Sequence, residues 1–152
     1  MRISPLNEIS IDMTEFLLDT NVVSELRKGP RAVPSVRAWY EAIDEDGLYL
    51  SVLVIGELGR GVERIRRRDK ISAQKLEIWL RGVVDDFSDR VLPVTESIAR
   101  IWGSFGVPDP ISTVDGLLAA TAQHHGLVLV TRNVKDVAST GVAVVNPFES
   151  SD

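Results

Sequence analysis

The stretch Phe16-Leu-Leu-Asp-Thr-Asn-Val-Val-Ser-Glu25 decides the fold of this 152-residue chain. Its first three residues form a short apolar run that Asp19 stops, which is typical of the end of a buried strand. The residues from Thr20 to Lys28 are predicted to form a helix, because Gly29-Pro30 follows and closes it. A buried strand that passes directly into a helix is the building unit of a parallel α/β sheet.

The same alternation of short apolar strands and helices continues along the chain. Further strands are predicted at 48–50, 91–94, 127–130 and 142–145, and further helices at 33–43, 52–68, 71–87, 95–105, 112–125 and 133–137. This pattern indicates a parallel sheet that is buried on both faces. We therefore expect an α/β protein with a three-layer α/β/α architecture and a parallel sheet of four to five strands.

The composition is that of one ordinary globular domain, with 44% hydrophobic and 26% charged residues. The chain contains no cysteine, which excludes thiolate zinc sites and cysteine nucleophiles. We expect no signal peptide, and no apolar run reaches the roughly 20 residues that a membrane span needs, so we expect a cytoplasmic protein without membrane contact. We expect a flexible leader over residues 1–15, with Met13 as an alternative start, a domain over 16–149 and a tail over 150–152.

Three acidic residues lie at or near the ends of predicted strands, namely Asp19, Glu57 and Asp115. A parallel sheet gathers the carboxyl ends of its strands, where such folds bind ligands, at one edge. Asp19 alone could instead cap its helix, and Asp115 could form a capping box with Ser112. Glu57 has no such role, and it lies in an otherwise apolar helical turn where a lone carboxylate is costly to bury. Glu57 therefore favours a functional cluster.

Gathered carboxylates repel one another, and a hard divalent cation with oxygen ligands relieves the repulsion. We therefore expect Mg²⁺ or Mn²⁺ at this edge, and hydrolysis of a phosphodiester by an activated water. A fourth ligand could come from Asn133 or Asp136, although the two residues could also form an N-cap pair. The net charge of −5 argues mildly against nucleic-acid binding, but basic residues are concentrated between Arg60 and Lys70. This concentration could be a solvated helix face, or it could contact RNA or an acidic partner through Arg60, Arg64, Arg67 and Arg68.

Four segments together resemble the motifs of PIN-domain proteins, in particular VapC-type toxins of the FitB-like subgroup. They are Phe16–Glu25, Leu50–Gly61 (Leu-Ser-Val-Leu-Val-Ile-Gly-Glu-Leu-Gly-Arg-Gly), Asp115–Ala122 (Asp-Gly-Leu-Leu-Ala-Ala-Thr-Ala) and Leu129–Asp136 (Leu-Val-Thr-Arg-Asn-Val-Lys-Asp), and Val145-Asn-Pro-Phe148 resembles the closing strand. The resemblance covers residues 16–149. It implies the toxin of a type II toxin–antitoxin system, a Mg²⁺- or Mn²⁺-dependent endoribonuclease that cuts RNA, with transfer RNA as the suggested substrate. It also implies a homodimer and a VapB-like antitoxin, which together would form a heterotetramer or a larger assembly.

The resemblance also assigns roles to individual residues. Asp19, Glu57 and Asp115 fall on the acidic positions of the family's site, and either Asn133 or Asp136 would complete it, since the family often has an acid where this chain has Asn133. Polar positions that orient the carboxylates fall on Thr20, Asn21, Ser24 and Thr131. The alternative is a receiver-like or other non-catalytic α/β binding module. A receiver would need an acidic pair after one strand and a lysine after a late one, and that arrangement is not evident.

Overall fold

The first strand, β1 (Phe16–Leu18), lies at the centre of a five-stranded parallel sheet in the computed structural model, which describes residues 13–149. The other strands are β2 (Leu48–Ser51), β3 (Val91–Leu92), β4 (Val128–Val130) and β5 (Val144–Val145), and the order across the sheet is β3-β2-β1-β4-β5. The register pairs Phe16 with Leu48 on one side and with Val128 on the other. The expected parallel sheet is therefore confirmed, with five strands.

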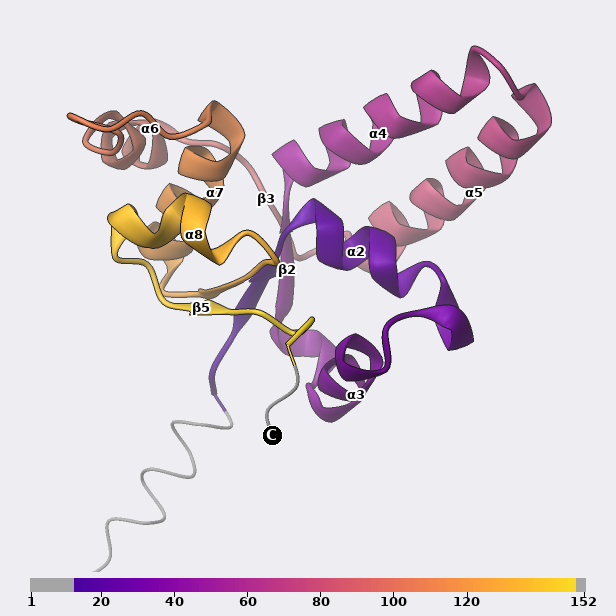
Figure 1. The fold of residues 1–152 in the computed structure, drawn as a ribbon, viewed down its shortest axis with the longest axis horizontal. Helices are drawn as coiled ribbons and strands as arrows, with labels where there is room; N and C mark the ends of the chain where they lie inside the picture. The colour runs from indigo at the N-terminus through magenta and orange to yellow at the C-terminus, as the bar shows by residue number, and fades with distance from the viewer. Residues whose placement is uncertain (1–12, 150–152) are drawn as a thin grey trace, which may run out of the picture.

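Helices cover both faces of this sheet, so the predicted three layers are present (Figure 1). The helices are α2 (Thr20–Leu26), α3 (Pro34–Ala42), α4 (Val52–Arg66), α5 (Lys70–Asp86), α6 (Glu96–Gly103), α7 (Thr113–His125) and α8 (Val134–Val137). Helices α4 and α5 form an antiparallel hairpin that projects away from the sheet (Figure 1). Short 3-10 helices occupy η1 (Gly29–Arg31), η2 (Glu45–Gly47) and η3 (Ala138–Thr140).

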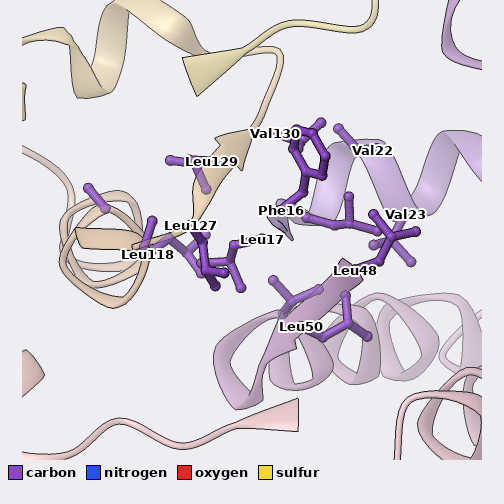
Figure 2. Close-up of a cluster of buried hydrophobic side chains, with 14 of the residues drawn as sticks. Phe16, Leu17, Val22, Val23, Leu48, Leu50, Leu118, Leu127, Leu129 and Val130 are labelled. Atoms are coloured by element: carbon purple, nitrogen blue, oxygen red, sulfur yellow. The ribbon is translucent and has the colours of Figure 1, made fainter. Parts of the chain in front are cut away.

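The core lies where the central strands meet the helices, and Figure 2 shows its side chains. Leu17, Leu48 and Leu50 are fully buried, as is Leu118 from α7. All three residues of β1 are buried, as expected of a strand that has a helical layer on each face. This packing fixes the position of the residue that follows β1.

Several predicted elements end earlier than their hydrophobic pattern suggests, among them α2 and α4, which each end two residues early. The strand predicted over 91–94 stops at Leu92, because Pro93 has no N–H with which to continue the ladder. The helix predicted over 95–105 ends at Gly103. The predicted leader and tail lie largely outside the described residues, although Glu15 accepts a hydrogen bond from the Val128 N–H at 2.9 Å. Within residues 13–149, every helix is too short or too polar to span a membrane.

Candidate active site

The candidate site lies at the carboxyl ends of β1 and β4, the neighbouring strands between which the strand order reverses. Ligands of open α/β sheets bind at such a switch point. Asp19 follows β1 and is only 6% exposed. One oxygen of its carboxylate, Oδ1, accepts a hydrogen bond from the Thr20 N–H at 2.7 Å, and the other, Oδ2, accepts one from the Thr131 hydroxyl at 2.7 Å. Asp19 is therefore both the N-cap of α2 and a carboxylate held at the switch point.

Glu57 reaches this edge from the second turn of α4. Its Oε1 accepts a hydrogen bond from the Thr20 hydroxyl at 2.5 Å, so Thr20 contacts both acids through different atoms. The expectation that Glu57 is buried in an apolar turn is wrong, because its side chain is exposed. Adjacent helical residues point in different directions, and the buried neighbours Val54 and Leu58 lie on the core side of α4. The sequence argument for Glu57 therefore relied on a burial that the fold does not impose.

Asp115 lies in the first turn of α7 and is half-buried. The Ser112 hydroxyl oxygen accepts a hydrogen bond from the Asp115 N–H at 3.3 Å, which is one half of the predicted capping box. The other half is missing, since the Asp115 carboxylate makes no hydrogen bond or ion pair within residues 13–149. Capping therefore leaves this carboxylate free to bind a ligand.

The charges of Glu57 and Asp115 both act on Asp19. Burial is the main cause that raises the pKa of Asp19 above its ordinary value, and the charges of Asp115 and Glu57 raise it further. The hydrogen bonds from Thr131 and Thr20 oppose this rise without cancelling it. The sheet and the helices α4 and α7 thus place Glu57 and Asp115 within electrostatic range of Asp19.

A divalent cation fits the chemistry of these ligands, which are all carboxylate oxygens. The Asp115 carboxylate is unbonded and Glu57 uses only Oε1 in its hydrogen bond, so oxygens are free to turn towards a cation. Within residues 13–149, however, no three acidic or histidine side chains already stand close enough to hold a metal ion. The tight convergence that we expected is therefore not formed. Like charges at such a site repel one another, and a bound cation would relieve that repulsion.

The other predicted ligands are Asn133, which directly precedes α8, and Asp136 within it, and both are exposed. The Asn133 N–H donates a hydrogen bond to the Thr131 hydroxyl oxygen at 3.0 Å, which connects the start of α8 to the Asp19 network. Its side chain does not cap α8, so the predicted N-cap pair with Asp136 is not formed. The Asp136 carboxylate has no hydrogen-bond or ion-pair partner in the described part of the chain.

Two of the predicted supporting residues lie beside the acids without touching them. Asn21 accepts a hydrogen bond at 3.4 Å from the N–H of Arg132, which ties α2 to the loop after β4. Ser24, one turn further along α2, is half-buried and makes no side-chain hydrogen bond within residues 13–149. The structure therefore brings Thr20 and Thr131 into contact with the acids, and leaves Asn21 and Ser24 outside that contact.

Two charged residues near the site were not selected from the sequence. Glu25 is buried in α2 and accepts hydrogen bonds from the Val33 N–H at 2.9 Å and from the Lys28 ammonium at 3.0 Å. The guanidinium of Arg132 lies over the ring of Phe148, 4.6 Å from its centroid. The sequence could have pointed to Glu25, because it lies among mostly apolar residues in Val-Val-Ser-Glu-Leu. The same criterion led us to select Glu57.

Other features lie away from the acids. His124 and His125 are at the far end of α7 from Asp115, with their rings edge to face. A pocket of about 500 Å³ opens between α2, α3 and α5, and Trp79, Val83 and Phe87 line part of it. The three carboxylates are not among its lining residues.

Comparison with known proteins agrees with this geometry. The PIN domain family model matches residues 16–138, so the chain belongs to the PIN-domain family. Toxin FitB from Neisseria gonorrhoeae is 32% identical over 140 residues, which cover 88% of this chain and 98% of FitB. A crystal structure of FitAcB from the same organism matches 89% of this chain and 99% of its own, with a TM-score of 0.80 and 32% identity.

Two further relatives narrow the identification. The VapC ribonuclease Y4jK from Sinorhizobium fredii is 33% identical over 143 residues, covering 88% of this chain and 98% of the relative. A toxin–antitoxin complex from Klebsiella pneumoniae contains a chain with a TM-score of 0.69 and 26% identity, and the match covers 90% of this chain and all of that one. Within its family, the chain is therefore a VapC-type toxin, and the resemblance in the sequence motifs is confirmed.

Proposed function

We propose that the chain cleaves internal phosphodiester bonds of RNA, as the toxin of a type II toxin–antitoxin system. The observation that carries this proposal is the position of Asp19 at the switch point of the sheet, where Thr20 connects it to Glu57 and the charges of Glu57 and Asp115 both act on it. Membership of a family of metal-dependent ribonucleases supports the same chemistry. Membership of this family also excludes the alternative of a receiver-like module.

Asp19, Glu57 and Asp115 would hold Mg²⁺ or Mn²⁺, with Asn133 or Asp136 completing the site. The cation would neutralise the scissile phosphate and lower the pKa of a bound water. Thr131 and Thr20 hold the two oxygens of Asp19 in place, and Thr20 also orients Glu57. The Asp115 carboxylate, which no protein group engages in the described residues, is free to accept a proton from the attacking water at one of its oxygens.

The partners follow from the same membership. We infer a homodimer that binds a VapB-like antitoxin, giving a heterotetramer or a larger assembly. The toxin would act in the cytoplasm, where RNA is available. Transfer RNA is the substrate that the family suggests. The Klebsiella pneumoniae complex of a related toxin with an antitoxin supports the partner.

The test is cleavage of RNA by the purified protein with Mn²⁺, with and without EDTA. We expect cleavage by the wild type, none in EDTA, and none by Asp19→Asn, which preserves the helix cap. Asp85→Asn is the matched control, because it removes the same charge from an exposed position near the end of α5. Equal RNA loss with wild type and Asp19→Asn would indicate a contaminating nuclease and would refute the proposal.

A further inference from the structure

A row of arginines leads away from the candidate site along α4. Arg60 and Arg64 follow Glu57 by three and seven residues, and Arg68 follows it by eleven, in the turn after the helix. Residues at these spacings lie on one side of a helix. We call Arg60, Arg64 and Arg68 the arginine row. Since α4 starts beside the sheet and projects outwards, the row runs from the site to the tip of the α4–α5 hairpin (Figure 1).

No member of the arginine row has a partner within residues 13–149, and all three are exposed. Acidic residues lie near the row in the sequence, but each of them binds a group other than an arginine of the row. Glu57 accepts the Thr20 hydroxyl, and Glu63 binds Arg66, which also binds Glu77 of α5. Asp69 caps α5 through the Ser72 N–H.

No ion pair within residues 13–149 therefore neutralises the positive charges of the row, although the chain as a whole is acidic. The exposed arginines Arg81 and Arg100 differ, since each forms an ion pair with a glutamate of its own helix. Consecutive members of the row are about 6 Å apart along the helix axis, at 1.5 Å per residue. Regularly spaced, unpaired cations that begin at a phosphodiester-cleaving site match a strand of phosphates that has to pass through that site.

We propose that the arginine row binds the phosphates of a single RNA strand on one side of the bond that is cut. This proposal rests on the proposed ribonuclease function. Arg67 borders the row and supplies a further positive charge at its outer end. An acidic protein segment would also be attracted to these arginines, but the continuity of the row with the catalytic carboxylates favours the substrate strand.

The test compares the wild type with the triple variant Arg60→Gln, Arg64→Gln, Arg68→Gln. The matched control changes Arg31, Arg81 and Arg100 to glutamine, which removes the same charge from exposed positions outside the row. We expect the row variant to raise KM for an unstructured RNA on the order of tenfold while kcat stays unchanged, and we expect no change in the control. The salt exponent of binding should fall by about 2, since each phosphate contact on a single strand contributes about 0.7.

A second measurement separates this proposal from the proposed function. Binding of a fluorescent, unstructured RNA is followed by anisotropy in EDTA, where no cleavage is expected. Weaker binding by the row variant than by the control would support the row even if the wild type proves to cleave no RNA. Equal affinities and salt exponents for the two variants would overturn the proposal. So would a row variant that binds RNA normally but loses the cognate antitoxin, which would make the row a protein-binding surface.

Discussion

The Thr131 hydroxyl donates a 2.7 Å hydrogen bond to Oδ2 of Asp19, although 112 residues separate the two along the chain. The bond connects the ends of β1 and β4, which are neighbours only because the chain crosses the sheet between them. The same hydroxyl oxygen accepts the Asn133 N–H at 3.0 Å, so its proton is committed to Asp19. Thr131 is 1% exposed, so the hydrogen bond lies in the protein interior.

Replacing Thr131 with valine should therefore impair both stability and cleavage. Valine keeps the shape but leaves a buried carboxylate oxygen and the Asn133 N–H without partners, which costs about 1–3 kcal/mol. Urea unfolding and RNA cleavage with Mn²⁺ measure the two effects. Thr131→Ser is the control, since it keeps the hydroxyl and should retain most of the activity. A loss in Thr131→Ser together with little or none in Thr131→Val would mean that packing of the methyl group matters and the hydrogen bond does not.

Asp115→Asn should stabilise the protein in EDTA. The Asp115 carboxylate makes no hydrogen bond within residues 13–149 and repels Asp19, so its removal relieves repulsion at no cost in contacts. We expect a gain of about 0.5 kcal/mol, as for like-charge pairs elsewhere, and a melting temperature higher by about 1–2 °C.

In saturating Mn²⁺, the wild type should instead be more stable than Asp115→Asn. A ligand at 100 times its Kd stabilises the folded state by about 2.7 kcal/mol, and the wild type should bind the ion more tightly than Asp115→Asn. Thermal melts with EDTA and with Mn²⁺ measure both states. A lower melting temperature for Asp115→Asn in EDTA would argue against repulsion at the site.

The sequence was sufficient to predict the fold because its signals are local. Each strand is a short apolar run, and Ser51, Thr95 and Ser112 cap helices at or next to the predicted helix starts. The strand after Arg90 was predicted too long, since the apolar pattern continues past Pro93, which has no N–H for the ladder, and the partner strand β2 ends opposite Leu92.

The site could be predicted only in part. The acids are found from their positions after strands, but the contact between Thr20 and Glu57 joins residues 37 apart and depends on how α4 packs against α2. Hydrophobic neighbours in sequence suggested that Glu57 was buried, whereas the helix turns it outwards. The distances between the carboxylates likewise depend on how the helices pack and on side-chain conformations, which the sequence pattern does not specify.

Glu25 should make stability depend on pH in the acid range. The Val33 N–H and then Lys28 hold the pKa of Glu25 below its ordinary value of 4.5. A carboxylate with a depressed pKa in the folded state stabilises the fold above the unfolded pKa, and this contribution is lost as the pH falls through the folded value.

Glu25→Gln should thus be less stable than the wild type at pH 7, and the difference should shrink as the pH falls below 4.5. Urea titrations at a series of pH values measure it. Glu41→Gln, which changes an exposed glutamate of α3, is the control and should follow the wild type. A pH-independent difference would show that the amide disturbs packing and that the charge is unimportant.

Gly116 should not tolerate alanine, although glycine inside a helix is usually unfavourable. A Cβ at Gly116 would lie 2.8 Å from Cδ1 of Trp102, whereas a Cβ at Gly82 in α5 would meet nothing within 4 Å. Gly82→Ala should therefore stabilise the protein by about 0.5–1 kcal/mol through helix propensity alone. Gly116→Ala should destabilise it by about 1–2 kcal/mol, because overpacking against the rigid indole outweighs the same gain.

Gly116→Ala should also reduce RNA cleavage, because Asp115 precedes Gly116 in the same helical turn and would move with it. A double-mutant cycle with Trp102→Ala tests the cause, since removing the indole removes the clash. In that background, the alanine at position 116 should become neutral or stabilising, like the one at position 82. If Gly116→Ala costs as much without the indole as with it, the contact with Trp102 does not explain the glycine, and the α6–α7 packing does not position Asp115.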